Sequence, residues 1–189
     1  MDSVAGMDEP RIPPLPLESA DESIEPALEM LRQHWGGELP NVFATLAQHP
    51  RLFAKWLPFS SHVLLASSLP ARERELAILR TGRRCDCAYE FGQHRRIGME
   101  AGLSGAEVEA TAAPLDSFDW SPRERALLVA VDQLCAHHDL DGAAWHGLGE
   151  HFDEEQLLDL VFCVGAYAML SMALNGLRVQ LDDDIAGFP

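Results

Sequence analysis

The residues best suited to chemistry lie close together in one segment, residues 73–98. Cys87, Glu90 and His94 are spaced there at i, i+3 and i+7, so a helix would carry them on one face. Glu90 and His94 are an i,i+4 pair, close enough to hydrogen-bond and share a proton. A neighbouring carboxylate raises the pKa of a histidine towards working pH. The spacing therefore predicts general acid–base catalysis by Glu90 and His94.

A cysteine and a group of arginines accompany this pair. Cys87 falls in the first turn of the expected helix, where the helix dipole and free N–H groups favour a thiolate. The chain carries only 14 Lys and Arg against 30 Asp and Glu, a formal net charge of −16. A basic cluster in so acidic a chain indicates a cleft that accepts an anion. The arginines of the cluster are Arg80, Arg83, Arg84, Arg95 and Arg96.

Each of these residues also has a purely structural interpretation. A single histidine such as His94 is commonly a partly buried structural residue. A single cysteine such as Cys87 commonly packs as a small apolar side chain. An arginine cluster commonly forms surface ion pairs. Their convergence on one helix face favours a functional site.

Helices are the elements expected to position the segment. Apolar residues recur three and four positions apart from residue 23 onward, and no alternation rich in Val, Ile and Thr indicates a strand. Pro70 is predicted to open a helix that ends at Gly82, and Asp86 to cap the next helix, which ends before Gly102. We predict an all-α bundle of eight or nine helices. Further predicted N-caps are Ser104, Ser121, Asp141 and Asp153.

The rest of the chain fits a single domain, residues 21–189, preceded by an arm. Residues 1–20 are rich in proline and acidic residues and predict a flexible arm, one that could reach a neighbouring subunit. The start of the chain lacks the basic and apolar stretches of a signal peptide, and the apolar run 157–174 is too interrupted to predict a membrane span. The acidic balance repels phosphate groups, so we expect a cytoplasmic protein that binds neither nucleic acid nor membrane.

The segment resembles the carboxymuconolactone decarboxylase and alkylhydroperoxidase D superfamily. The resemblance rests on Arg-Glu-Leu-Ala-Ile-Leu-Arg at 74–80, on Tyr-Glu-Phe-Gly-Gln-His-Arg-Arg-Ile-Gly at 89–98 and on Ala-Gly-Leu-Ser at 101–104. Looser matches extend it over about residues 38–181. The resemblance implies a helical bundle of the alkylhydroperoxidase D-like type.

The peroxidase branch of the superfamily carries a Cys-x-x-Cys motif before the histidine and an upstream glutamate that relays protons. Cys87, His94 and Glu75 match the first cysteine, the histidine and the glutamate, but Glu90 takes the place of the second cysteine. That second cysteine is the expected peroxide-attacking residue, and a carboxylate can form neither a sulfenic acid nor a disulfide. The decarboxylase-like branch, which tolerates a glutamate there, is the better match.

Resemblance to the decarboxylase-like branch implies proton transfer on a small carboxylated or lactone substrate, without a cofactor or a metal. His94 is expected to protonate or deprotonate a substrate carbon. Glu90 would orient and tune His94, and Glu75 would complete the relay.

The substrate-binding residues and the assembly also follow from the resemblance. Arg80 or Arg95 would hold a substrate carboxylate. Tyr89 or Phe91 would flank the site, although only one of the two can face it. The superfamily implies a homo-oligomer, a dimer, trimer or hexamer, with sites near the subunit interfaces. The histidines near the end of the helix expected at 121–138 are interpreted as complements to the helix dipole, not as metal ligands.

Two other functions are compatible with the sequence. The first is a thiol-dependent antioxidant peroxidase in which Cys87 reacts with peroxide and is resolved by Cys85 or an external thiol. The second is a non-catalytic oligomeric binding protein that keeps the bundle. Formation of a sulfenate at Cys87 would distinguish the first, and an ordinary titration of His94 would distinguish the second.

Overall fold

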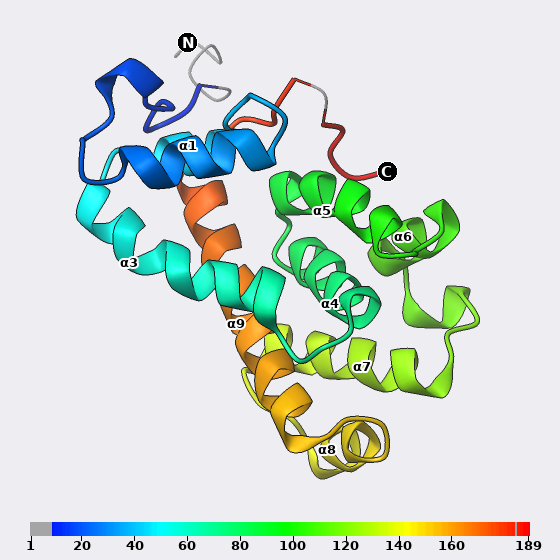
Figure 1. The fold of residues 1–189 in the computed structure, drawn as a ribbon. Coiled ribbons are helices and arrows are strands. Elements are labelled where there is room, and N and C mark those ends of the chain that lie inside the picture. Colours follow the sequence, from blue (N-terminus) through cyan, green and yellow to red (C-terminus); the bar gives the residue numbers. More distant parts are fainter. Residues whose placement is uncertain (1–8, 184) are drawn as a thin grey trace.

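The computed structural model describes residues 9–183 and 185–189, and all regular secondary structure among them is helical (Figure 1). The predicted all-α bundle is confirmed. Two short 3-10 turns, Leu17–Ser19 and Leu115–Ser117, and a π-helical segment, His62–Ala66, supplement the α-helices. The α-helices are α1 (Glu25–His34), α2 (Asn41–Leu46), α3 (Pro50–Ser61), α4 (Ala71–Arg84), α5 (Ala88–Glu100), α6 (Gly105–Ala112), α7 (Pro122–His137), α8 (Gly142–Gly149) and α9 (Glu154–Leu177).

Helix α4 runs through the middle of the bundle, with α5, α6, α7 and α9 packed against it (Figure 1). Leu76, Ala77 and Leu79, which the sequence predicts to face inward, are completely buried. Burial extends to the charged residues Glu75 and Arg80, because neighbouring helices cover α4 on all sides. A buried charge is stable only when it is paired, so the position of α4 requires partners for both.

Side-chain caps confirm the predicted starts of the later helices. Ser104, Ser121 and Asp153 each accept a hydrogen bond from the backbone N–H three residues on, and each belongs to a complete capping box. Asp141 accepts the equivalent bond at the start of α8. The turns that the sequence marks most clearly are therefore held by local hydrogen bonds.

The start of α5 differs from the prediction. Asp86 is not its cap: this residue adopts left-handed backbone geometry, with φ 51°, and Cys87 takes the N-cap position. The Cys87 N–H donates to the Gly82 carbonyl at 2.8 Å, which is the long bond of a Schellman motif that ends α4. The connection between α4 and α5 is thus a tight turn, and the hydrogen bonds that end α4 determine its geometry.

The described part of the predicted arm lies along its own chain. The Arg11 N–H donates to the Leu177 carbonyl at 2.8 Å, and the Leu15 N–H donates to the Ala44 carbonyl at 3.0 Å. Residues 1–8 lie outside the described residues, and the flexibility of the arm stays a prediction.

The C-terminal tail packs across α5. A Cβ atom at Gly92 would lie 2.5 Å from the Ala186 carbonyl oxygen, so only glycine allows the tail to approach the helix this closely. Phe188 packs on Phe91 with 5.1 Å between ring centroids. The tail therefore covers the side of α5 that carries Phe91.

Helix α9 is, within the described residues, the one helix long and apolar enough to cross a membrane by length and composition. In the sequence, the polar residues within the run 157–174 argue against a membrane span. The helix nevertheless meets the criteria of length and composition. A share of 39% of its most apolar window is buried, and the helix packs against α4, α7 and the π-helical segment. One side of α9 therefore packs into the bundle, and several of its large apolar side chains face outward.

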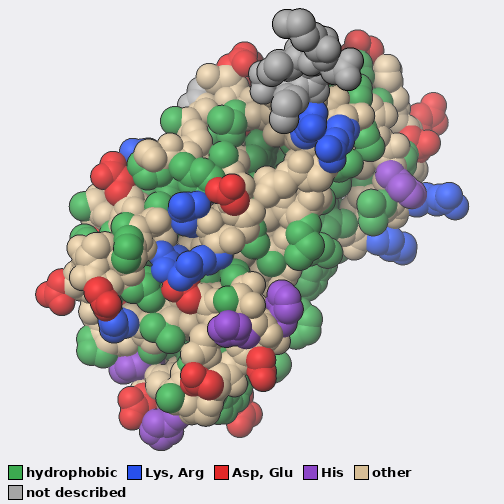
Figure 2. All heavy atoms as spheres, turned by 180° about the vertical axis from the view of Figure 1, so that it is seen from behind, with side chains coloured by type: hydrophobic (Ala, Val, Ile, Leu, Met, Phe, Trp, Pro, Cys, Tyr) green, Lys and Arg blue, Asp and Glu red, His purple; other side chains and the backbone are tan. Residues whose placement is uncertain are grey.

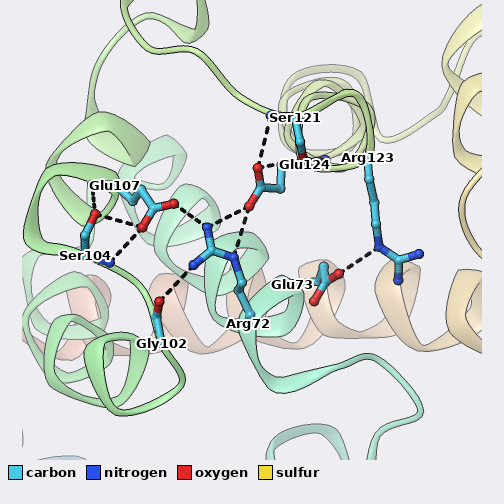
Figure 3. A network of polar contacts seen from close by, with 8 residues as sticks. All are labelled: Arg72, Glu73, Gly102, Ser104, Glu107, Ser121, Arg123 and Glu124. Carbon is cyan, nitrogen blue, oxygen red and sulfur yellow. Dashed lines mark hydrogen bonds and ion pairs between the residues drawn. The ribbon is translucent and has the colours of Figure 1, made fainter.

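A guanidinium group joins the starts of three helices (Figure 3). Arg72, in the first turn of α4, binds Glu107 of α6 and Glu124 of α7, the latter at 2.7 Å. Both glutamates also complete capping boxes, with Ser104 and Ser121. Because each carboxylate serves a helix cap and Arg72 at once, the network fixes how α6 and α7 approach α4.

Replacement of Arg72 by glutamine is expected to lower the free energy of unfolding by about 2–3 kcal/mol, because it leaves two partly buried carboxylates without their cation. Burial raises the pKa of Glu107, but hydrogen bonds from Arg72 and Ser104 outweigh it and lower that pKa to about 2. This stabilisation is therefore present above pH 4.5 and lost as the pH falls towards 2. Urea unfolding followed by circular dichroism at several pH values measures both effects.

Arg125→Gln provides the matched control. Arg125 forms an ion pair with Asp116 at 2.5 Å, but the side chains are 48% and 87% exposed. An exposed pair contributes about 0–1 kcal/mol, so this variant is expected to unfold close to wild type. Equal losses in both variants would show that the Arg72 network has no special role.

Candidate active site

Two adjacent helices bring the predicted glutamates and histidine together. Helices α4 and α5 form a hairpin, and Gly98 of α5 lies where the two approach closely. A Cβ atom at Gly98 would lie 3.0 Å from Leu103 Cδ1 and 3.3 Å from Leu79 Cδ1, so these two side chains would have to shift to admit a larger residue. This close packing places Glu75 Oε2 of α4 at 2.7 Å from His94 Nδ1 of α5.

The second imidazole nitrogen faces the other predicted carboxylate. His94 Nε2 lies 3.5 Å from Glu90 Oε2, one helical turn away. Tyr167 of α9 sets its ring at right angles to the imidazole, with 4.9 Å between centroids. Glu75, Glu90 and His94 are at most 5% exposed. The structure thus brings the three predicted acid–base residues into one buried cluster, which we call the relay.

Burial and charge set the protonation of the relay. Burial raises the pKa of Glu90 to about 7, with His94 opposing this rise and Glu75 adding to it. Burial lowers the pKa of His94, but the charge and hydrogen bond of Glu75 and the charge of Glu90 outweigh it, so that the pKa of His94 is raised. The pKa of Glu90 is thus raised towards neutral pH and that of His94 is also raised, so both groups are suited to general acid–base chemistry.

Glu75 has a partner at each oxygen of its carboxyl group. Its Oε1 accepts a hydrogen bond from Arg74 Nε at 3.2 Å, while its Oε2 faces His94. A carboxylate beside Nδ1 accepts the proton of that nitrogen and so selects the imidazole tautomer. Nε2 is then the nitrogen that gains or loses a proton, and it lies on the side of Glu90.

The relay borders a small cavity of about 50 Å³. This volume holds about one or two water-sized groups, so only the reacting end of a substrate fits. A larger hollow of about 570 Å³ lies along α1, but none of the relay residues lines it. Besides His94 and Glu90, the small cavity is lined by Trp35, Pro40, Val42, Phe43, Trp56, Ser60, Leu64, Tyr89, Gln93, Ile97, Tyr167 and Leu170.

A wider pocket of about 410 Å³ adjoins this cavity and shares Trp35, Leu64 and Ile97 with it. Two arginines, Arg74 and Arg96, line the wider pocket. The Arg96 guanidinium lies over the Trp35 ring, 5.2 Å from its centroid. The wider pocket, which Glu100 also lines, therefore has two cationic groups and one acidic group beside the cavity at the relay.

The predicted thiolate at Cys87 is wrong. The residue stands at the N-cap of α5, but it is completely buried beside Val42, Tyr89 and Leu174. Burial raises the pKa of the Cys87 thiol to about 11. Cys87 does not line the cavity at the relay. Packing against distant parts of the chain outweighs the helix dipole here, and Cys87 is a structural core residue.

The geometry lends no support to the predicted substrate-binding roles of Arg80 and Arg95. Arg80 is 3% exposed and forms two bonds of 2.7 Å with Asp132 of α7. It also donates to the carbonyls that end α6, so its donors are used in packing. Arg95 lies on the surface, 3.7 Å from Glu109. Neither arginine lines the cavity or the wider pocket, because both point from the hairpin towards α6 and α7.

Of the two predicted flanking aromatic residues, Tyr89 faces the cavity. Its hydroxyl donates to Asp182 Oδ2 at 2.7 Å and accepts from the Val42 N–H at 3.1 Å. Tyr89 thereby ties the C-terminal tail and α2 to the wall of the cavity. Phe91 lies on the opposite side of α5, under the tail.

Several site residues were not singled out from the sequence. Arg74 directly precedes Glu75, and its position next to a relay residue was a usable signal. Tyr167 and Trp35 come from distant helices, and nothing in their local sequence marks them. Within the described residues, no group of three or more His, Cys, Asp and Glu side chains is arranged to hold a metal ion.

Comparison with known proteins identifies relatives of this architecture. Residues 50–133 match the model of the carboxymuconolactone decarboxylase family. No curated protein sequence matches the chain. An uncharacterized peroxidase-related protein from Ralstonia eutropha, described as an alkylhydroperoxidase AhpD core, is 24% identical, with 93% of each chain covered and a TM-score of 0.83.

Two further solved structures share the fold. A peroxidase-related protein from Silicibacter sp. is 18% identical over 95% of this chain and 97% of its own, with a TM-score of 0.82. A variant of the debrominase Bmp8, solved in complex with 2,3,4-tribromopyrrole, is 18% identical over 91% of each chain, with a TM-score of 0.76. At these identities the likeness concerns the fold.

The Glu90 carboxyl group is expected to titrate near pH 7, because burial raises its pKa to about 7. Carboxyl ¹³C resonances of glutamate-labelled protein measure this directly. Glu90→Gln should remove the resonance that moves near neutral pH and leave the others in place. The surface residue Glu109 provides the matched control, as Glu109→Gln should leave that resonance unchanged. A midpoint for Glu90 near its ordinary value of 4.5 would contradict the buried relay.

Proposed function

We propose that the chain is a member of the carboxymuconolactone decarboxylase and alkylhydroperoxidase D-like superfamily, and that it catalyses proton transfer in the manner of the decarboxylase-like branch. The proposed substrate is a small carboxylated or lactone compound. The observation that carries this proposal is the buried relay of Glu75, His94 and Glu90 at the end of a small, largely apolar cavity.

The relay suits a reaction in which a carbon atom exchanges a carboxylate for a proton. When the bond to the carboxylate breaks, CO₂ leaves and the electron pair stays on the carbon, delocalised into a neighbouring carbonyl. His94 then gives its Nε2 proton to that carbon, and Glu90, with a pKa of about 7, returns a proton to His94. Glu75 keeps the imidazole in one orientation and stabilises its charged form.

The lining of the cavity supports the same step. Trp35, Phe43, Trp56 and Tyr167 surround the relay and leave about 50 Å³. A carboxylate loses favourable hydration when it enters such an apolar space, whereas neutral CO₂ does not. The cavity therefore favours loss of the carboxylate, and exclusion of water leaves His94 as the proton donor.

The wider pocket supports a substrate with a second anionic group. Arg74 and Arg96 replace Arg80 and Arg95 as the proposed binding residues for a carboxylate, because they line the pocket that adjoins the relay. One end of the substrate would lie against these guanidinium groups and the reacting end would enter the small cavity. Binding at a distance from the reacting carbon positions that carbon for proton transfer.

The thiol peroxidase alternative finds no support in the geometry of Cys87. Glu90 occupies the position beside the histidine, and the Cys87 thiol is buried with its pKa raised to about 11. A thiol in this state forms little thiolate at neutral pH, and the thiolate is the form that attacks peroxide.

We also propose that the protein is a cytoplasmic homo-oligomer. Helix α9 presents apolar side chains to solvent at Leu158, Phe162 and Met172, which are 62%, 57% and 67% exposed. Exposed apolar side chains of this size favour association through apolar contacts. On the face shown in Figure 2, basic side chains lie in groups among hydrophobic and acidic ones. Sedimentation velocity should show a dimer or larger species, and Phe162→Asp should shift it towards monomer. A monomeric wild type would contradict this proposal.

His94→Asn is expected to lower turnover by about 100- to 10,000-fold, since general acid–base groups contribute on that scale. A panel of small carboxylated lactones and β-keto acids would be screened for CO₂ release and for deuterium uptake from D₂O. His146→Asn is the matched control, because that histidine is 81% exposed and paired only with Glu150 among the ion pairs. Retention of turnover in a folded His94→Asn protein would refute the mechanism.

Peroxide consumption with a dithiol reductant tests the competing function. Wild type and Cys87→Ser are expected to behave alike, because Cys87 is too deeply buried to react. Loss of peroxide turnover on replacement of Cys87 alone would move the protein to the peroxidase branch. An unperturbed His94 titration with no turnover on any substrate would favour the non-catalytic alternative.

A further inference from the structure

A buried carbonyl oxygen beside the relay has no hydrogen-bond partner within the protein. Gln93 of α5 directly precedes His94, lines the small cavity and is 6% exposed. Its side-chain oxygen Oε1 is buried and accepts no hydrogen bond. A buried acceptor without a partner costs free energy, so its position at a reactive cluster points to a ligand that supplies the missing donor.

Other buried side-chain atoms in the described residues also lack a partner, but they lie elsewhere. These are Thr45 Oγ1, Trp120 Nε1 and Ser171 Oγ. None of the three residues lines the small cavity or the wider pocket. Of these atoms, Oε1 of Gln93 is therefore the one whose residue a substrate entering the cavity would meet.

The C-terminal tail fixes the orientation of the Gln93 amide. Its Nε2 donates a hydrogen bond to Asp182 Oδ2 and a second, at 3.4 Å, to the Tyr89 hydroxyl oxygen. A carboxylate accepts hydrogen bonds and donates none, so Nε2 and not Oε1 must face Asp182. The amide cannot turn over without the loss of this bond, and Oε1 is the end left for a ligand.

The Asp182 carboxylate is itself held by two other segments. Its Oδ1 accepts from the Asn41 N–H at 2.8 Å, and its Oδ2 accepts from the Tyr89 hydroxyl at 2.7 Å. Tyr89 in turn accepts from the Val42 N–H at 3.1 Å. Helices α2 and α5 and the tail therefore hold the amide of Gln93 together. A carboxylate at Nε2 also polarises the amide towards Oε1, which makes that oxygen a stronger acceptor.

The surroundings of Oε1 favour a neutral donor over an anion. Glu90 lies three residues before Gln93 on α5, and Asp182 lies at the other end of the Gln93 amide. A substrate carboxylate at Oε1 would bring a further acceptor to a carbonyl oxygen, with no proton between them. A hydroxyl group has a proton to donate, and it is small enough for a cavity of about 50 Å³.

We propose that Gln93 Oε1 accepts a hydrogen bond from a hydroxyl group of the substrate and so determines specificity for a hydroxylated compound. The assignment rests on the proposed function, because the hydroxyl belongs to the reacting end of the same small carboxylated or lactone substrate. A site built to bind a hydroxyl discriminates against the analogue that lacks it, since the buried acceptor then stays unpaired. Gln93 binds and positions the substrate, and His94 and Glu90 move the proton.

Matched pairs of small aromatic acids test the proposal on the whole native protein. The probes are the ortho, meta and para hydroxybenzoates and the corresponding methylbenzoates, in which a methyl group of similar size replaces the hydroxyl. Their carboxylates suit Arg74 and Arg96 of the wider pocket. Isothermal titration calorimetry measures each affinity. We expect at least one hydroxybenzoate to bind about 10- to 100-fold more tightly than its methyl counterpart, because the methyl group leaves Oε1 unpaired.

Gln93→Met keeps the length of the side chain and removes the acceptor, so this preference should disappear. Gln133→Met is the matched control. Gln133 lies away from the cavity and uses both ends of its amide, with Nε2 donating to Asp141 Oδ2 at 2.8 Å and Oε1 accepting from the Asp141 N–H at 2.9 Å. That variant should keep the preference of wild type.

A crystal structure of wild type with the preferred hydroxybenzoate decides the matter even if Gln93→Met does not fold. The hydroxyl oxygen should lie within about 3 Å of Gln93 Oε1. Equal affinities for the two series, binding of neither, a preference that persists in Gln93→Met, or a bound hydroxyl that contacts another group would each overturn the proposal.

Binding is measured without turnover, so the two proposals fail separately. Loss of the hydroxyl preference would leave the His94 mechanism intact. A wild type that keeps the preference but shows no turnover dependent on His94 would refute the proposed function and leave the role of Gln93 in place.

Discussion

The contact between Glu75 and His94 is the constraint on which the rest of the site depends. A carboxylate with no exposed surface is tolerable only when another group compensates its charge. The fold meets this need from both sides, with the imidazole at 2.7 Å and Arg74 at 3.2 Å. At Gly98, where α5 packs on Leu79 of α4, the absence of a side chain leaves room for this packing. Tyr167 packs its ring against the imidazole from the side of α9, and burial of the neighbouring Glu90 carboxyl group raises its pKa.

The relay was predictable from sequence because its geometry is local. An i,i+4 spacing fixes Glu90 against His94 on any α-helix, and the resemblance supplied Glu75 from the preceding helix. The helix starts at Ser104, Ser121 and Asp153 were predictable for the same reason, since a capping box involves four consecutive residues. Helix spacing and helix caps depend little on the tertiary contacts of the rest of the chain.

The arginines show where prediction from sequence ends. Arg80 is drawn to Asp132, a residue of α7 that no local pattern connects to it. Arg74 and Arg96 face the wider pocket because α1 contributes Trp35 to the same surface. Which arginines line the wider pocket therefore depends on contacts with residues that are distant in the sequence. Cys87 follows the same logic, because contacts with Val42 and Leu174 bury it and outweigh the helix dipole that favours a thiolate.

Helix α4 links the site to the rest of the bundle. It carries Glu75, which faces His94 of α5, and Arg80, which pairs with Asp132 of α7. The two side chains therefore tie one helix to different neighbours. The ion pair with α7 holds α4 in place, and α5 brings the imidazole to the buried carboxylate on that fixed helix.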